Sequence, residues 1–110
     1  MPGDIVYIQA PRVGETLKHG QAVIAVGGTA VPLAADPTPC QGVSIQVMPG
    51  NASNVWVGGA AITSNGATGG NVLVPAAGAQ PPTLWLSAND LSSVYINSAV
   101  LGQGVNFMYW

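Results

Sequence analysis

Short runs of alternating apolar and polar residues limit what this chain can fold into. In the segment GVSIQVM (42–48), Val43, Ile45 and Val47 alternate with Ser44 and Gln46. Side chains two residues apart lie on the same face of a β-strand, so this run predicts a strand with one aliphatic face. Comparable segments recur about every 8–12 residues, which is typical of a β-sandwich or barrel. They are 21–27, 29–34, 42–48, 54–60, 71–74, 83–87, 93–98 and 104–110.

Helices are not indicated anywhere in the chain. No window keeps an apolar period of about 3.6 residues between capping signals, and the segment NDLSS (89–93) is compatible with a single helical turn. The 15 glycines and 9 prolines mark frequent turns between short segments. The sequence therefore predicts an all-β fold, an antiparallel β-sandwich or barrel of about eight short strands.

Composition excludes several classes of protein. A chain of 110 residues with 48% hydrophobic and 5% charged residues is one domain with a core, because disorder needs the opposite balance. Every apolar run is interrupted before it reaches the length of a transmembrane helix, and the first residues lack the pattern of a secretory signal, so no membrane partner is expected. Two basic residues and a net charge of −2 argue against nucleic-acid binding.

The few charged residues are unevenly distributed. Four of the six lie in the first 20 residues, beside His19, and from Pro37 to Trp110 Asp90 is the only one. We therefore divide the chain into an N-terminal strand or arm with a charged loop (1–20) and a β-sandwich body (21–110). A plain edge strand followed by a charged loop is the alternative interpretation of the first segment. The candidate docking residues of the arm are Asp4, Tyr7, Arg12, Glu15 and Lys18.

No catalytic or metal-binding pattern is present. Cys40 is the only cysteine and His19 the only histidine, and the four acidic residues fit neither a hydrolase pair nor a calcium loop. The glycine-rich NGATGG (65–70) lacks the lysine and the helix of a phosphate-binding loop. We interpret Cys40 as a small buried hydrophobic residue. The chain is expected to be no enzyme and to carry no cofactor and no metal.

The aromatic residues point to an interaction surface. Trp56, Trp85 and Tyr95 alternate with aliphatic residues, which places them on the faces opposite the aliphatic rows. A strand in a two-layered sandwich has one core-facing side, so these three are expected to face outward. Exposed clusters of Trp and Tyr mark interaction surfaces. With almost no charge to keep neighbouring molecules apart, we favour a surface covered by assembly.

The segment GVNFMYW (104–110) is apolar on both of its faces. Val105, Phe107 and Tyr109 share one face, whereas Met108 and Trp110 share the other. This predicts a strand that is covered on both sides, on one side by a neighbouring subunit. The candidate interface residues for an oligomer or a larger assembly are Trp56, Trp85, Tyr95, Met108 and Trp110.

Four segments together resemble a known family. They are GTAVPLA (28–34), CQGVSIQVMPGNASNVWVGG (40–59), NVLVPAAG (71–78) and LSSVYINSAVLGQGVNFMYW (91–110). Over roughly residues 28–110 the chain resembles small all-β virion proteins of tailed bacteriophages, of the head-decoration or capsid cement type. Members of that family often carry Tyr at the position of Trp56.

The resemblance implies a fold, partners and a location. The fold would be a jelly roll or a related β-sandwich, and the partners would be further copies of the chain, as a homotrimer, and the lattice of the major capsid protein. The protein would be made in the host bacterial cytoplasm and lie on the capsid surface of the virion, where it stabilises the head. The family carries no catalytic residues. Similar modules also occur as head-fibre or tail-associated components, which is the alternative location.

A carbohydrate-binding β-sandwich module is the alternative from another class of function. In it, Trp56, Trp85 and Tyr95 would stack against sugar rings. Such modules usually combine aromatic side chains with polar and charged hydrogen-bonding groups, and charged groups are scarce from Pro37 onward.

Overall fold

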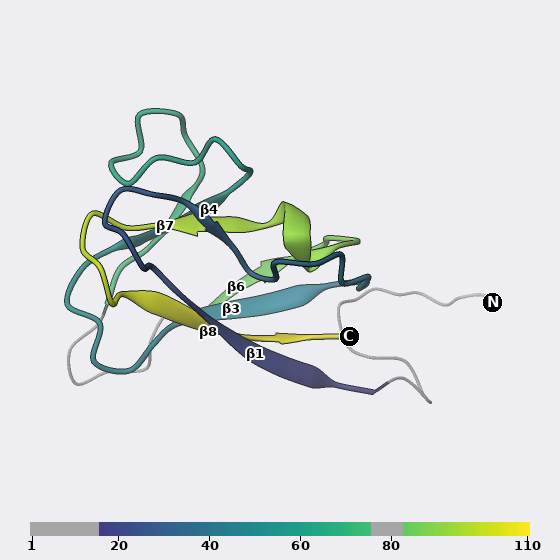
Figure 1. Ribbon diagram of the computed structural model, residues 1–110. Coiled ribbons are helices and arrows are strands. Elements are labelled where there is room, and N and C mark those ends of the chain that lie inside the picture. Colours follow the sequence, from purple (N-terminus) through teal and green to yellow (C-terminus); the bar gives the residue numbers. More distant parts are fainter. Residues whose placement is uncertain (1–15, 76–82) are drawn as a thin grey trace.

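The structure is a computed structural model that describes residues 16–75 and 83–110. In these residues two antiparallel four-stranded sheets pack face to face (Figure 1). The elements are β1 (Lys18–Val23), β2 (Val31–Pro32), β3 (Val43–Val47), β4 (Val55–Gly58), β5 (Asn71–Leu73), β6 (Thr83–Leu86), the 3-10 turn η1 (Leu91–Ser93), β7 (Tyr95–Asn97) and β8 (Gly104–Tyr109). The predicted all-β sandwich of short strands is confirmed.

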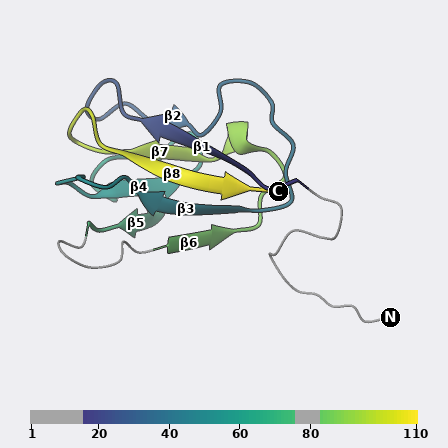
Figure 2. The ribbon, with the colours of Figure 1, turned by 90° about the horizontal axis from the view of Figure 1, so that it is seen from below.

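The strand order is that of a jelly roll. One sheet has the order β1-β8-β3-β6 and the other the order β2-β7-β4-β5 (Figure 2). Most consecutive strands therefore lie in different sheets, and the chain passes from one sheet to the other between them. Eight strands wound in this way form two Greek keys. The jelly-roll-like fold that the resemblance implied is confirmed.

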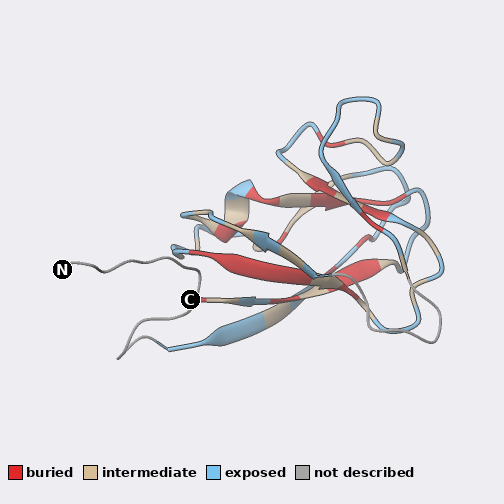
Figure 3. Ribbon diagram, turned by 180° about the vertical axis from the view of Figure 1, so that it is seen from behind, coloured by how far each residue is buried: buried red, intermediate tan, exposed pale blue. Residues whose placement is uncertain are grey.

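The aliphatic rows of the sequence form the core between the two sheets. Val43 and Ile45 of β3 are fully buried, as are Val55 of β4 and Ile96 of β7. Figure 3 shows the buried stretches of the facing strands in red. Because side chains alternate along each strand, the residues between them face outward on both sheets. Burial of one face per strand, against its counterpart across the sandwich, is what the alternation predicted.

β8 lies between β1 and β3, and its inner face joins the core. Phe107 lies opposite Gly20 of β1, and a Cβ atom at position 20 would come within 2.7 Å of Cζ of Phe107. Glycine therefore makes room for the phenyl ring in the sheet. Of the two covers expected for residues 104–110, the structure shows the one over Val105 and Phe107, which are buried; Met108 on the other face is 44% exposed, and its cover by a neighbouring subunit stays a prediction.

The first strand begins earlier than the sequence indicated. Lys18–Gly20 pairs with Tyr109–Phe107 of β8, so these three residues belong to the sheet and not to a charged loop before it. The alternation of 21–27 placed the strand too late, because it could not show that the polar residues Lys18 and His19 continue the ladder. The first part of the predicted N-terminal strand or arm, with its candidate docking residues Asp4, Tyr7, Arg12 and Glu15, lies outside the described residues.

Candidate functional site

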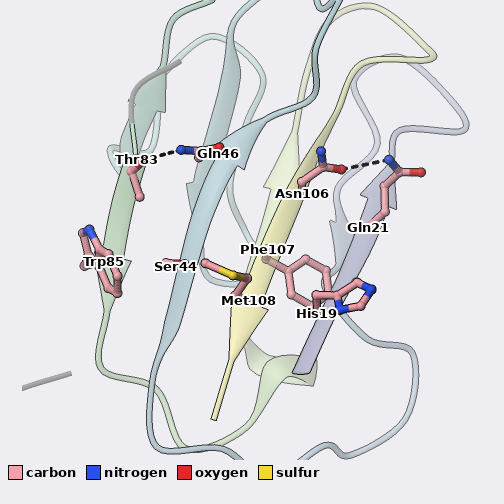
Figure 4. A pocket seen from close by; sticks show the side chains of 10 residues that line it. His19, Gln21, Ser44, Gln46, Thr83, Trp85, Asn106, Phe107 and Met108 are labelled. Carbon is pink, nitrogen blue, oxygen red and sulfur yellow. Dashed lines mark hydrogen bonds between the residues drawn. The ribbon is translucent and has the colours of Figure 1, made fainter. Parts of the chain in front are cut away.

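The outer face of the β1-β8-β3-β6 sheet carries two rows of side chains that point away from the core. The strand register aligns His19, Met108, Ser44 and Trp85 in one row and Gln21, Asn106, Gln46 and Thr83 in the next. We call these eight residues the outer sheet face. They line a concavity of about 790 Å³, which Figure 4 shows from close by.

The second row is held by hydrogen bonds between neighbouring strands. Gln21 Nε2 donates to Asn106 Oδ1 at 2.8 Å, and Gln46 Nε2 donates to Thr83 Oγ1 at 2.6 Å (Figure 4). Each bond fixes the rotation of an amide group and leaves other polar atoms free to bind a ligand. Those are the Asn106 amide protons, the Gln21 and Gln46 carbonyl oxygens and the Thr83 hydroxyl proton.

The first row ends in an exposed indole. Trp85 is 55% exposed, whereas Trp110 is 6% exposed, and the two ring centroids lie 5.9 Å apart. Trp110 lies against Gly42, where a Cβ atom would come within 2.8 Å of the indole. Its backbone is fixed as well, because Gln41 N–H donates to its carbonyl at 2.6 Å. Trp110 thus packs beside Trp85 and supports its ring.

The five candidate interface residues do not share one surface. Trp85 and Met108, which is 44% exposed, lie together on the outer sheet face. Trp110 was expected beside Met108 as an interface residue. Its indole lies against Gly42 and Trp85 and is 6% exposed, so contact of this side chain with a partner stays a prediction. The residue follows the last paired position of β8, and its N–H donates to the Gly42 carbonyl at 3.3 Å.

Trp56 and Tyr95 belong to the other sheet and are each partly buried. The indole of Trp56 is covered by the loop that follows β4, where a Cβ atom at Gly66 would come within 2.6 Å of the ring. Gly66 has a φ of 78°, a conformation that favours glycine, so the close approach and the turn both depend on it. Contacts of Trp56 or Tyr95 with a partner stay a prediction.

A second surface was not foreseen from the sequence. Val26, Val100 and Leu101 are 61%, 45% and 67% exposed, and they lie on the β1–β2 and β7–β8 loops. The two loops are bound together, since Gly28 N–H donates to the Ser98 carbonyl at 2.8 Å and Gly102 N–H to the Ile24 carbonyl at 2.9 Å. We call Val26, Val100 and Leu101 the apolar tip.

The charged side chains lie at the opposite end of the sandwich from the apolar tip. Among residues 16–75 and 83–110 they are Lys18, Asp36 and Asp90. Lys18 pairs with Tyr109 at the far end of β8, and Asp90 Oδ1 accepts from Thr38 N–H at 2.8 Å just before β3 begins. In the described part of the molecule the charged residues therefore lie away from the apolar tip, although Leu17, beside Lys18, is also 51% exposed.

Alternation could have found the polar row, because Gln46 and Asn106 each stand between two core residues in the sequence. The apolar tip had a weaker signal, the pair Val100 and Leu101 followed directly by Gly102. Two adjacent aliphatic residues before a turn glycine do not fit the alternation of a strand. That both loops meet at one end follows only from the strand order.

Cys40 offers little nucleophilic chemistry. Its Sγ donates to the Ala88 carbonyl at 3.1 Å, and burial, followed by the negative charge of Asp90, raises the pKa of the thiol. A raised pKa keeps the group protonated, which is the less reactive form. Within the described ranges, no three His, Cys, Asp or Glu side chains come together to hold a metal ion. No helix in the described part is long and apolar enough to span a membrane.

The comparisons with known proteins give no family. No protein-family model matches the chain, and no curated protein matches it. Among solved structures, the chain is similar to one described as "Bacillus endospore appendages form a novel family of disulfide-linked pili". The two are 18% identical, the match covers 94% of this chain and 95% of the other, and the TM-score is 0.37. A likeness at that score carries no argument about function.

Proposed function

We propose that the protein is a structural virion protein, a capsid decoration or cement protein that binds the outer head lattice of a bacteriophage as a homo-oligomer and stabilises it. The resemblance of residues 28–110 suggests the family and a trimer. Jelly rolls recur in viral capsid proteins, which is compatible with this proposal, although lectins and other proteins share the fold.

The observation that carries the proposal is the apolar tip. Three aliphatic side chains are 45–67% exposed on adjoining loops, far from the charged residues that the structure describes. Exposed apolar clusters of this kind mark contact surfaces. Fully burying such a side chain contributes about 1.5–3 kcal/mol, so covering the exposed part of each supplies roughly 1 kcal/mol.

Assembly multiplies this modest energy. A single tip is too small for tight binding, since association carries a large entropic cost. Three tips held in one trimer and facing three equivalent lattice sites act together, because the second and third contacts form at a high effective concentration. Decoration would therefore be strong on an intact lattice and weak on isolated capsid subunits.

The test starts with purified virions and with heads that lack the protein. Mass spectrometry of virions should find the chain at hundreds of copies, and added protein should rebind to bare heads and raise the temperature at which they rupture. Leu101→Ser should weaken rebinding, whereas Val74→Ser, which alters a side chain that is 51% exposed elsewhere, should not. A chain that is absent from virions, or a Leu101→Ser variant that rebinds like the wild type, contradicts the proposal.

The location within the particle is part of the same test. A head-fibre or tail-associated component would also be found in the virion, but at far fewer copies and bound at a vertex or on the tail. Immunogold labelling of intact particles separates these cases. Labelling over the whole head supports a decoration protein, and labelling confined to the tail overturns that assignment.

A further inference from the structure

We propose that the outer sheet face is a binding site for a neutral saccharide chain. This binding is separate from the assembly proposed above, because it uses the β1-β8-β3-β6 sheet and not the apolar tip. Such a site suits a ligand that is apolar on one face and rich in hydroxyl groups at its edges. The three observations that carry the inference are the exposed indole of Trp85, the row of fixed amides and the lack of charge.

Trp85 supplies the apolar contact. Its ring is 55% exposed, lines the concavity and is supported by the buried Trp110 at 5.9 Å between ring centroids. A supported indole presents a flat surface at a small entropic cost on binding, and Met108, 44% exposed in the same row, extends the apolar contact. A pyranose ring is a polar ligand with one apolar face, made of C–H groups, and that face fits a flat indole.

The neighbouring row supplies hydrogen bonds to hydroxyl groups. Gln21 and Gln46 are each bound to a cross-strand partner, Asn106 or Thr83, at 2.8 and 2.6 Å. This leaves amide protons and carbonyl oxygens side by side along the row, at fixed orientations (Figure 4). A sugar hydroxyl both donates and accepts, so it can pair with such adjoining groups. Preorganised polar groups beside an apolar surface are typical of small-molecule sites.

The lack of charge on the outer sheet face indicates which class of ligand it suits. Neither row holds a residue with a formal charge at pH 7, counting His19 as neutral. In the strands of this sheet Lys18 is the only charged residue, and its Nζ lies 5.5 Å from the centroid of the Tyr109 ring. A sulfated or uronic-acid polymer would find no row of cations here to match its own charge. The site is therefore suited to a neutral glycan.

A second copy of the chain is a poorer occupant of this face. The exposed large apolar side chains in the two rows are Trp85 and Met108, with Val23 of β1 further along the same side, whereas the whole second row is polar. Stacking two such faces would bury amide groups that lose water, and each amide left without a partner costs about 1–3 kcal/mol. Interface cores between protein copies are usually more apolar than this.

The test uses affinity electrophoresis through gels that contain a soluble α-glucan, β-glucan, mannan or galactan, with polygalacturonate and heparin as polyanionic probes. At least one neutral polymer should retard the wild-type protein, and the polyanions should not. Trp85→Ala should weaken that retardation about tenfold, the effect expected for losing one buried aromatic contact. Gln46→Ala should weaken it by a smaller factor. Leu101→Ser, which removes an exposed side chain outside the face, should bind the polymer as the wild type does.

Three results would contradict the inference. Retardation by none of the four neutral polymers, retention by polyanions instead, or equal binding by Trp85→Ala and the wild type would each do so. Light scattering adds the last outcome: if Trp85→Ala dissociates an oligomer and leaves glycan binding unchanged, the face is a protein interface. Failure here is distinct from failure of the decoration proposal, because Leu101→Ser tests the capsid contact and leaves this face intact.

Discussion

The Trp85 and Trp110 rings lie 5.9 Å apart at an angle of 53°, with Trp85 exposed and Trp110 buried. The sequence analysis named both residues as candidate interface residues, but in the structure they have different roles. Trp110 completes the packing at the end of β8, whereas Trp85 presents its ring to solvent on β6.

Trp110→Ala should therefore destabilise the fold much more than Trp85→Ala. Removing a buried Trp side chain costs about 3–5 kcal/mol, and removing a largely exposed one costs roughly 0.5 kcal/mol. Urea unfolding followed by circular dichroism measures both free energies of unfolding. Equal losses in the two variants would show that Trp110 does not support the end of the sheet.

Gly20→Ala should destabilise the β1–β8 pairing. The added Cβ atom would lie 2.7 Å from Cζ of Phe107, so the phenyl ring must move in a packed core. Overpacking of this kind costs about 1–3 kcal/mol. The measurement is the shift in the urea midpoint.

Two further variants decide whether that cost comes from the contact. Gly59→Ala is the matched control, because a Cβ atom there meets nothing within 4 Å, and it should change the stability by less than about 0.5 kcal/mol. Adding Phe107→Leu to Gly20→Ala should recover part of the loss relative to Phe107→Leu alone. No coupling between the two positions would contradict the steric explanation.

The strands were largely predictable, and the two surfaces were predictable only in part. Alternation identified the core rows around Ile45 and Phe107, because burial of one face repeats every second residue. It could not distinguish Trp85 from Trp56, since both alternate with aliphatic residues. Their exposure depends on what covers each sheet from outside, and for Trp56 that is a loop turned by Gly66.

The apolar tip and the early start of β1 depend on contacts between distant residues. Val26 and Leu101 are far apart in the sequence, and their loops are hydrogen-bonded to each other because the jelly-roll order brings these loops together. Likewise, Lys18 and His19 extend a strand only because β8 offers them partners in Tyr109 and Met108. Local pattern carries no information about such pairings.

Asn97 should be indispensable as a donor. It is 2% exposed, and its Nδ2 donates to the Ile62 carbonyl at 3.0 Å and to the Gly28 carbonyl at 3.2 Å, so it fixes two loops to β7. Asn97→Asp removes both donors and places an acceptor against two carbonyls, which should cost about 2–4 kcal/mol at pH 7. Urea unfolding measures this loss.

The pH dependence of that variant provides a second readout. A carboxyl buried among carbonyl oxygens has its pKa raised, so its protonated form is favoured in the folded state. The penalty of Asn97→Asp should therefore shrink as the pH falls toward about 5. A penalty that is the same at pH 5 and pH 7 would show that the loss of packing, and not the missing donors, causes it.

Asp90 should stabilise the turn before β7 only while it is ionised. The backbone N–H of Thr38, then the backbone N–H and hydroxyl of Ser92, donate to its carboxylate and lower the pKa of Asp90. A pKa that is lower in the folded than in the unfolded state adds stability above the unfolded value, near about pH 4, and that stability is lost as the pH falls through the folded pKa.

Asp90→Asn keeps an oxygen acceptor but not the charge, so it should be less stable than the wild type at pH 7 and nearly equal to it at about pH 2. Asp90→Ala should be the least stable at both pH values, because it also leaves the N–H groups of Thr38 and Ser92 without their acceptor. Urea midpoints at the two pH values measure the differences, and a gap between the wild type and Asp90→Asn that persists undiminished in acid would contradict a role for the charge.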